Sequence, residues 1–346
     1  MKLYHLRQVD WIDSQLIYHA QPRLYIEGLN ILAPSSPYIC IGYHQNLEQE
    51  VDLDYCKANH IPVFRREVGG GAVFLDGNQI FYQLVMHKDN PLAQGSKADF
   101  YQRLLKPVVD TYQELGIPAQ YRPVNDVITA EGRKIAGTGV AEIGDYIILV
   151  GNLIADFDYQ TMTRVLRVPD EKFRDKVFKS MTENLTTIKR ELGKMLSWDE
   201  MAEPLIRHFE KVLGSLDPSQ LSDEIKNKIE EIKPKYLSDE WLYLKRRDLG
   251  HRNVKIATDV NIIQHAHKAP GGLMKAVYEL KDNTITDLSL SGDYFCYPPD
   301  VDTRLSKLLN GRELSTVSQM IDDFYANEVI ETPGISAADW EKVICG

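Results

Sequence analysis

The chain has 346 residues, of which 43% are hydrophobic and 26% charged, with a formal net charge of -10 and a sequence pI near 5.5. This length exceeds what one hydrophobic core usually fills, so a large domain and a smaller one are expected. The negative charge argues against nonspecific binding to nucleic acids or to anionic membranes. The four cysteines form no closely spaced pair, and no apolar stretch approaches the roughly 20 residues of a membrane span. These features predict a cytoplasmic protein of a reducing compartment.

The first quarter of the chain contains several short apolar runs bounded by glycine, proline and polar residues. Such runs predict buried strands at residues 38–42, 62–64, 72–74 and 79–85. A short helix is expected to begin near Asp52, between the first two strands. A turn at residues 76–78 is expected to join the last two. The glycines before residue 72 are therefore predicted to lie at strand ends, within a sheet.

The middle of the chain predicts a long helix, a strand-rich block and further helices. Ser96 and Asp99 have the spacing of a capping box, and the apolar residues that follow predict a helix to about Leu115, stopped by Gly116. Strands joined by tight turns are predicted at residues 124–129, 134–141 and 146–154. Three later helices are predicted at residues 158–166, at 197–213, and from Asp217-Pro218 to about Lys233-Pro234.

The pattern of the last hundred residues predicts a small α+β domain. Strands are predicted at residues 254–257, 275–279 and 285–290, and helices at 302–309 and 315–326. His265 and His267 are expected on one strand face, and without a third ligand they do not predict a metal site. The boundary is expected between Leu244 and Arg252, which gives domains of residues 1–245 and 250–346. The predicted class is α+β, with mixed or antiparallel sheets flanked by helices.

The most informative segment is residues 65–74, where two arginines precede three consecutive glycines. Consecutive glycines cost backbone entropy, so they indicate positive φ angles or the close approach of another molecule. Arginine adds a planar fork of donors suited to phosphate or carboxylate, and backbone N–H groups can complete an anion site. The alternatives are a tight connection without ligand and a surface ion-pair site for the two arginines.

A second segment comprises Asn125-Asp126, a short turn, and residues 132–139. Lys134 stands at the mouth of the predicted hairpin, and the small residues that follow it leave room for a ligand along the strand. An ammonium in this position can contact a phosphate and an acyl oxygen together and stabilise charge that develops in acyl transfer. The alternative is an ordinary solvated lysine.

Together these segments resemble the lipoate-protein ligase family. The resemblance rests on the arginine-containing stretch that leads to Gly-Gly-Gly-Ala-Val-Phe at 69–74, on Asn125-Asp126, and on Lys134-Ile135-Ala136-Gly137. It extends to Gln45-Asn46, to residues 151–154 and to 168–173, and covers about residues 10 to 245. A weaker likeness joins the remainder of the chain to the accessory domain of that family. The implied fold is the catalytic domain shared by biotin and lipoate ligases, followed by that accessory domain.

The resemblance implies that the enzyme activates lipoate with Mg-ATP. The resulting lipoyl-adenylate would then acylate a lysine of an acceptor protein, either a lipoyl domain of a 2-oxoacid dehydrogenase or a glycine-cleavage H-type protein. Lys134 would be the catalytic residue and bridge the adenylate phosphate and the lipoyl carbonyl. Asp126 would orient this lysine or a magnesium ion. The residues implied to bind nucleotide and adenylate are Arg66, Gly70, Gly71, Ala72, Val73, Phe74, Asn78, Asp126, Lys134 and Gly137.

The sequence departs from the family pattern at two places. Leu75 replaces a common histidine, and Leu149-Val150 replaces His-His in many members. Both changes remove polar groups that the family pattern places near the acyl site, so they concern lipoate selectivity and acceptor choice. A member specialised for one acceptor is one hypothesis, and the accessory domain is expected to pack over or swing away from the site about a hinge near residues 243–250.

Three other functions compete with the ligase. A transferase of the same fold would carry octanoyl or lipoyl as a thioester on a cysteine, and no cysteine lies between Cys56 and Cys296. A biotin-protein ligase would have a Gly-Arg-Gly-Arg type of loop, which this sequence lacks. A noncatalytic lipoate-binding paralogue would not need Lys134.

Overall fold

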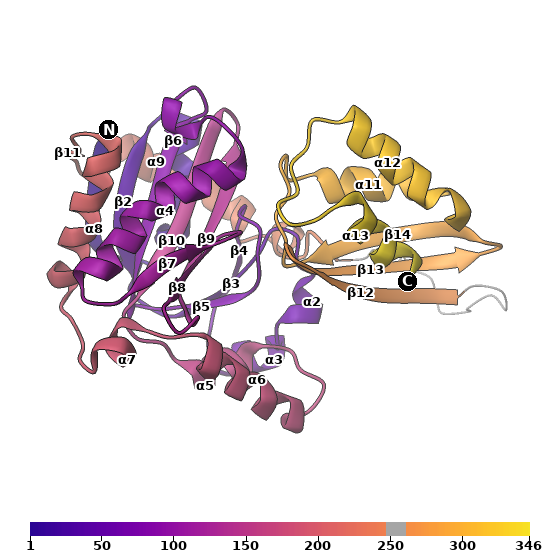
Figure 1. Cartoon of the computed structure of the whole chain (residues 1–346), viewed down its shortest axis with the longest axis horizontal. Coiled ribbons are helices and arrows are strands. Elements are labelled where there is room, and N and C mark those ends of the chain that lie inside the picture. The colour runs from indigo at the N-terminus through magenta and orange to yellow at the C-terminus, as the bar shows by residue number, and fades with distance from the viewer. Residues whose placement is uncertain (247–260) are drawn as a thin grey trace.

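The computed structural model describes residues 1–246 and 261–346 and shows an α+β protein of two parts that lie side by side (Figure 1). The larger part is built on an eight-stranded mixed sheet with the strand order β11-β1-β2-β6-β10-β9-β8-β7. Its strands are β1 (Lys2–Val9), β2 (Gly28–Pro34), β6 (Gln79–His87), β7 (Ala119–Arg122), β8 (Asp126–Thr129), β9 (Lys134–Ile143), β10 (Tyr146–Ile154) and β11 (Asp217–Pro218). Strand β1 runs parallel to β2 and β11, and the other neighbours are antiparallel.

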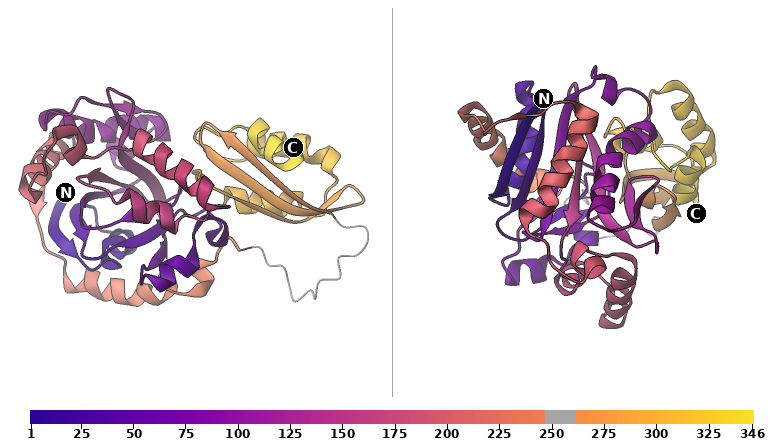
Figure 2. Two further views of the ribbon diagram at one scale, coloured as in Figure 1. Left: turned by 90° about the horizontal axis from the view of Figure 1, so that it is seen from below. Right: turned by 60° about the vertical axis from the view of Figure 1, so that its left-hand side comes forward.

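Helices cover both faces of this sheet (Figures 1 and 2). Helices α4 (Lys97–Glu114) and α8 (Trp198–Leu213) pack on one face, over the largest buried cluster. Helices α1 (Asp13–Ala20) and α9 (Asp223–Tyr236) pack on the other, beside a small sheet β4-β3-β5. The small sheet consists of β3 (Tyr38–Ile41), β4 (Val63–Arg65) and β5 (Val73–Leu75). The remaining helices are α2 (Leu47–Glu50), α3 (Leu53–Ala58), α5 (Tyr159–Val165), α6 (Glu171–Asn184), α7 (Ile188–Leu192) and α10 (Asp239–Leu242).

Local capping signals predicted most helix starts correctly. Ser96 and Ser197 each form a complete capping box at α4 and α8, and Asp158 caps α5. The prediction that Asp217-Pro218 opens a helix is wrong, because these residues pair as β11 with the edge of β1 and Ser222 caps α9 instead. That helix also continues past Pro234 to Tyr236.

The predicted turn at residues 76–78 is present, but the two strands that it joins do not pair with each other. Strand β5 pairs with β3 in the small sheet, whereas β6 pairs with β2 and β10 in the large one. The turn between them therefore carries the chain from one sheet to the other. The glycines before β5 lie between β4 and β5, at the ends of two strands of the small sheet.

The smaller part is a three-stranded antiparallel sheet with three helices on one face (Figure 1). Its elements are β12 (Asn261–Ala269), β13 (Gly272–Lys281), β14 (Thr284–Gly292), α11 (Val301–Leu309), α12 (Val317–Asn327) and α13 (Ala337–Cys345). The predicted strand at 254–257 lies outside the described residues, as does part of the predicted hinge. His265 and His267 both contact α13, through the carbonyl of Ile344 and the carboxylate of Asp339. None of the helices in the described ranges is long and apolar enough to span a membrane.

A buried polar cluster joins the two parts. The Asp302 carboxylate of α11 is fully buried, and its Oδ2 atom accepts hydrogen bonds from His44 Nδ1 at 2.8 Å, Lys245 Nζ at 2.8 Å and Tyr294 Oη at 3.0 Å. Burial alone would raise the pKa of Asp302, but the neighbouring His44 and Lys245 outweigh burial and hold this pKa well below its ordinary value. The smaller part is therefore fixed to the larger part by an ionised carboxylate.

Arg65 secures the chain that leads to the accessory domain. Its side chain is fully buried, and its guanidinium donates to the carbonyls of Gly42, Tyr43, Gln45, Trp241 and Leu242 at 2.8 to 3.1 Å. Burial lowers the pKa of Arg65 to about 10, which still leaves it charged at neutral pH. Arg65 is thus neither a surface ion pair nor a ligand group, because all of these partners are backbone carbonyls.

A buried histidine of α1 predicts loss of stability in acid. Burial lowers the pKa of His19 from 6.5 to about 4, although Glu67 opposes this shift. The neutral imidazole then stabilises the fold above pH 6.5, and this contribution of about 3 kcal/mol is lost as the pH falls towards 4. We expect H19Q to flatten the fall of unfolding free energy between these pH values, measured by urea denaturation. The exposed His60 supplies the control H60Q, and equal pH slopes in all three proteins would contradict this prediction.

Candidate active site

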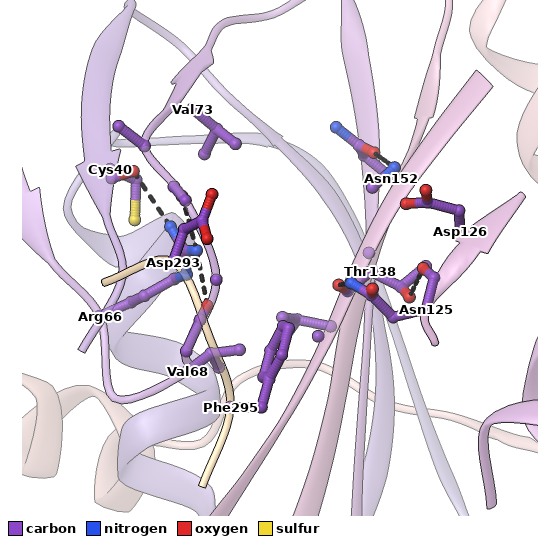
Figure 3. A pocket seen from close by; sticks show the side chains of 18 of the residues that line it. Cys40, Arg66, Val68, Val73, Asn125, Asp126, Thr138, Asn152, Asp293 and Phe295 are labelled. Atoms are coloured by element: carbon purple, nitrogen blue, oxygen red, sulfur yellow. Dashed lines mark hydrogen bonds between the residues drawn. The ribbon is translucent and has the colours of Figure 1, made fainter. Parts of the chain in front are cut away.

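One cavity of about 430 Å³ lies where the glycine loop, the strand ends of the large sheet and the accessory domain meet. Its volume falls within the range of small-molecule sites. Figure 3 shows the Arg66 side and the Asp126 side facing each other across it, with Phe295 of the accessory domain between them. The two segments singled out from the sequence, about 60 residues apart, therefore line a single space.

The glycine loop is shaped by Arg66. Its guanidinium donates to the carbonyls of Cys40 at 3.0 Å, Gly69 at 2.7 Å and Gly71 at 2.9 Å. Gly70 has a φ of +86°, which disfavours any side chain. A Cβ atom on Gly42 would lie 1.8 Å from the Gly70 carbonyl oxygen, so the bare backbone at both positions allows the loop to pack this closely. Arg66 thus fixes the loop and brings a positive charge to the cavity.

Lys134 is the first residue of β9 and points at a carboxylate on β8. Its Nζ atom lies 2.7 Å from Asp126 Oδ1, and the other Asp126 oxygen accepts a hydrogen bond from Arg122 at 2.7 Å. Burial would raise the pKa of Asp126, but the charge of Lys134 and hydrogen bonds from both cations outweigh it and lower that pKa. Asp126 therefore stays ionised and holds the ammonium in place. Its two oxygens are already engaged, which fits the orienting role better than that of a metal ligand.

The cavity floor is formed by the face of the large sheet that carries the small residues. Gly137 and Gly139 line this floor, and the Gly137 N–H donates to Asn152 Oδ1 at 3.0 Å. At Gly139 the bare backbone lets Val68 and Phe295 pack against the strand. Val150 lines this floor, whereas Leu149 points to the opposite face and is fully buried in the main core. Leu75 also lines the cavity. Two of the three residues that depart from the family pattern, Leu75 and Val150, thus make the cavity more apolar. The third, Leu149, does not face the cavity.

Two of the residues predicted to bind the nucleotide lie outside the cavity lining. Phe74 packs into a separate buried cluster with the apolar residues around α5. Asn78 is in the turn between β5 and β6, where its amide donates to Asp76 at 3.1 Å. The other predicted residues all line the cavity: Arg66, Gly70, Gly71, Ala72, Val73, Asp126, Lys134 and Gly137.

Sequence reasoning missed two sources of cavity residues. The accessory domain contributes Lys268, Pro270, Gly271, Gly272, Asp293 and Phe295, and α1 contributes Gln15 and Tyr18. The accessory domain also closes on the loop directly, since the Gly70 N–H donates to the Tyr294 carbonyl at 3.0 Å. The glycine pair at 271–272 was the one local signal for these residues. It predicts a turn, but it does not show that the turn borders the cavity.

The cavity lining includes a cysteine, which lies across the cavity from Asp126, the partner of Lys134. Cys40 of β3 lines the same cavity, on the side of Arg66. It was missed because sequence distance says little about which strand borders a cavity. Burial raises the pKa of the Cys40 thiol, although the charge of Arg66 opposes this, so the thiolate form is disfavoured.

The chain is similar to a family of known proteins. The family model of the lipoyl protein ligase A/B catalytic domain matches residues 18–210. The octanoyltransferase LipM of Kyrpidia tusciae is 27% identical over 231 residues, which is 60% of this chain and 84% of that protein. The lipoate-protein ligase LplJ of Bacillus subtilis is 26% identical over 287 residues, which is 82% of this chain and 80% of that protein.

Two solved structures of ligases share the fold. The bipartite lipoate protein ligase of Thermoplasma acidophilum, studied with its E2 lipoyl domain, superposes with a TM-score of 0.63 and 27% identity over 72% of this chain and 98% of that one. A lipoate-protein ligase A bound with ATP gives a TM-score of 0.58 and 25% identity over 69% of this chain and 97% of that one. Since the family match alone spans more than half of the residues, the chain belongs to the lipoyl protein ligase A/B catalytic domain family, whose enzymes transfer lipoyl or octanoyl groups to acceptor proteins.

Proposed function

We propose that this protein is an ATP-dependent lipoate-protein ligase. The observation that carries the proposal is the meeting of the Arg66-bound glycine loop and the Lys134–Asp126 pair in one cavity. A loop for nucleotide phosphates and an oriented ammonium are the two parts that carboxylate activation requires. The solved relative with bound ATP supports the same choice of nucleotide.

In the first half-reaction, a carboxylate oxygen of lipoate attacks the α-phosphorus of ATP, and pyrophosphate leaves with the electron pair of the broken P–O bond. In this proposal Lys134 contacts both the phosphate and the acyl oxygen of the resulting lipoyl-adenylate, and its ion pair with Asp126 supports that orientation. In the second half-reaction, the neutral amine of an acceptor lysine attacks the acyl carbon, AMP leaves, and the amine gives up a proton. Phe295 and the turn at residues 270–272 cover the cavity and exclude water from the adenylate.

The cavity fits magnesium as part of Mg-ATP. This ion usually binds through substrate phosphates with one or two carboxylates, and it keeps several waters. The cavity offers Asp293 for this, since both oxygens of Asp126 are engaged by cations. Among the described residues, no group of three or more His, Cys, Asp or Glu side chains could hold a metal without the nucleotide.

The acceptor is proposed to be a lipoyl domain or a glycine-cleavage H-type protein. The archaeal relative, studied with its E2 lipoyl domain, supports this class of partner. The more apolar acyl site made by Leu75 and Val150 suits lipoate and octanoate alike, because both end in an apolar chain.

The assay that tests the proposal is lipoate-dependent exchange of labelled pyrophosphate into ATP. We expect exchange with the purified protein, because formation of the adenylate is reversible. Absence of exchange, together with transfer of octanoate from an acylated carrier protein, would establish the octanoyltransferase instead. Absence of both would leave the noncatalytic paralogue.

The octanoyltransferase is the second candidate because relatives bear that name and Cys40 lines the cavity. The extent of one match favours the ligase, since LplJ matches 82% of this chain, whereas two LipM relatives match 60% and 68%. A thioester route needs a reactive thiolate, which burial of Cys40 disfavours.

Replacing Cys40 by serine decides between the two routes. We expect C40S to keep transfer activity within about threefold of wild type, because a ligase needs no covalent enzyme intermediate. The readout is acyl transfer to an acceptor domain, followed by mass spectrometry of the intact acceptor. Cys56, which is buried away from the cavity, supplies the control C56S. A loss above a hundredfold in C40S alone, with an acyl adduct on wild-type Cys40, would refute the ligase mechanism.

A further inference from the structure

A groove of about 620 Å³ runs along α6, outside the cavity described above. It is lined by Arg122, Lys134, Phe173, Lys176, Val177, Ser180, Met181, Asn184 and Leu185. Helix α6 has 14 residues and none of them is buried, and it projects from the lower edge of the catalytic domain in Figure 1. Phe173 on this helix is 46% exposed, although it is a large aromatic side chain. Apolar side chains of α6 thus point into an open groove. Such an exposed apolar surface is suited to binding a protein partner.

The groove reaches the reaction site. Lys134 lines both the groove and the cavity, so the two spaces meet at the residue proposed to contact the acyl carbonyl. Arg122 lines the groove and pairs with the same Asp126 that holds Lys134. A side chain that enters from the groove therefore arrives beside the Lys134 ammonium.

The groove is positively charged on a negatively charged protein. Arg122, Lys134 and Lys176 line it, and no Asp or Glu does. Asp126 beside the groove pairs with both Arg122 and Lys134, so one carboxylate offsets part of this charge and the excess is still positive. The whole chain, by contrast, has a net charge of -10. Complementary charge across an interface accelerates association and selects the partner. The expected partner surface is therefore acidic, with an apolar patch to cover Phe173.

We propose that this groove, between α6 and the strand ends at Arg122 and Lys134, is the docking surface for the acceptor domain. The occupant is a small folded domain with an acidic surface that presents its target lysine into the cavity past Lys134. The proposal rests on the proposed function and adds the site from which the second substrate enters. Phe173 and Val177 supply the apolar contact, and Lys176 with Arg122 supplies the attraction.

Two double variants of α6 test the proposal, and each replaces one phenylalanine and one lysine in the same way. The test variant is F173A/K176E, whose residues line the groove, and the control is F178A/K179E, whose residues lie on the same helix but do not line it. Phe178 is also exposed, at 36%, so neither variant removes a buried side chain. Transfer is measured from preformed lipoyl-adenylate to a lipoyl domain of a 2-oxoacid dehydrogenase. We expect the test variant to raise the KM for this domain at least tenfold, with kcat within about twofold, and the control to match wild type.

Two further measurements separate this proposal from the proposed function. Pyrophosphate exchange is expected to be the same in all three proteins, because α6 does not line the adenylate cavity. Binding of the unmodified lipoyl domain, measured by calorimetry without ATP, is expected to weaken in the test variant and to lose part of its dependence on salt. If the test variant bound the lipoyl domain more weakly and none of the three proteins showed pyrophosphate exchange, the docking surface would be supported and the ligase function would be rejected.

Other outcomes would overturn the proposal. Equal KM and equal binding in the two variants would place the acceptor elsewhere. Sedimentation that shows a wild-type dimer, dissociated in F173A/K176E while acceptor binding is unchanged, would assign the groove to a second copy of this chain. A fall in exchange in the test variant alone would mean that α6 acts on adenylation.

Discussion

Replacing Lys134 by alanine is expected to reduce lipoyl-adenylate formation by about a thousandfold. The ammonium lies 2.7 Å from Asp126 and faces the cavity in which phosphate and carboxylate must meet. Removal of one preorganised group that stabilises developing charge typically lowers kcat by about 10² to 10³. Pyrophosphate exchange measures the first half-reaction, and transfer from supplied lipoyl-adenylate measures the second. Both are expected to fall, because under the proposed mechanism Lys134 contacts the acyl oxygen in each.

The fold is expected to survive this change. The Lys134 side chain is 36% exposed, so its loss creates no large cavity in the interior. Lys189 is a suitable control, because it forms a similar ion pair with Asp156 at 2.6 Å but does not line the cavity. K189A should keep full activity, and an active K134A enzyme would remove the proposed mechanism.

The second large effect is expected from Asp302, which joins the two domains. D302A would leave the Lys245 ammonium and the His44 N–H without their shared acceptor in a buried contact. Removing one partner of a buried ion pair usually costs about 3 to 5 kcal/mol. We therefore expect the accessory domain to separate from the catalytic domain in a large fraction of molecules. Solution scattering should show a larger radius of gyration, and exchange activity should fall because residues 268–272 no longer cover the cavity.

The neighbouring Asp300 supplies the control for this experiment. Its side chain is 56% exposed and lies 3.8 Å from Arg304, outside the Asp302 cluster. D300A should scatter like wild type. If D302A also gave the wild-type profile, the buried cluster would not be what holds the domains together.

Short-range signals explain why much of the fold could be predicted from sequence. The capping boxes at Ser96 and Ser197 and the tight turns that join β8 to β10 are set by residues only a few positions apart. Strand partnership is different, because it depends on segments far apart in the chain. Residues 72–74 and 79–85 are joined by one short turn, yet β5 and β6 belong to separate sheets, since each pairs with strands elsewhere in the chain.

The candidate site shows the same division. Lys134, Asp126 and the glycine loop carry their chemistry in their residue types and could be recognised locally. The cavity position of Cys40 and Phe295 could not, because it depends on how β3 and the accessory domain pack against that loop. Leu149 and Val150 differ for a simpler reason, since successive strand residues point to opposite faces and only one of them can reach a ligand.

The contact at Gly139 suggests a way to loosen the cover of the cavity. A methyl group at this position would lie 2.5 Å from Val68 Cγ1 and 3.3 Å from the Phe295 ring, at the line where loop, sheet and accessory domain touch. Alanine there would press on Val68 of the glycine loop and on Phe295, and would loosen this contact without removing any charged group. Under the proposed mechanism, a less well covered intermediate would be hydrolysed more often, so the variant would consume more ATP for each acceptor that it acylates.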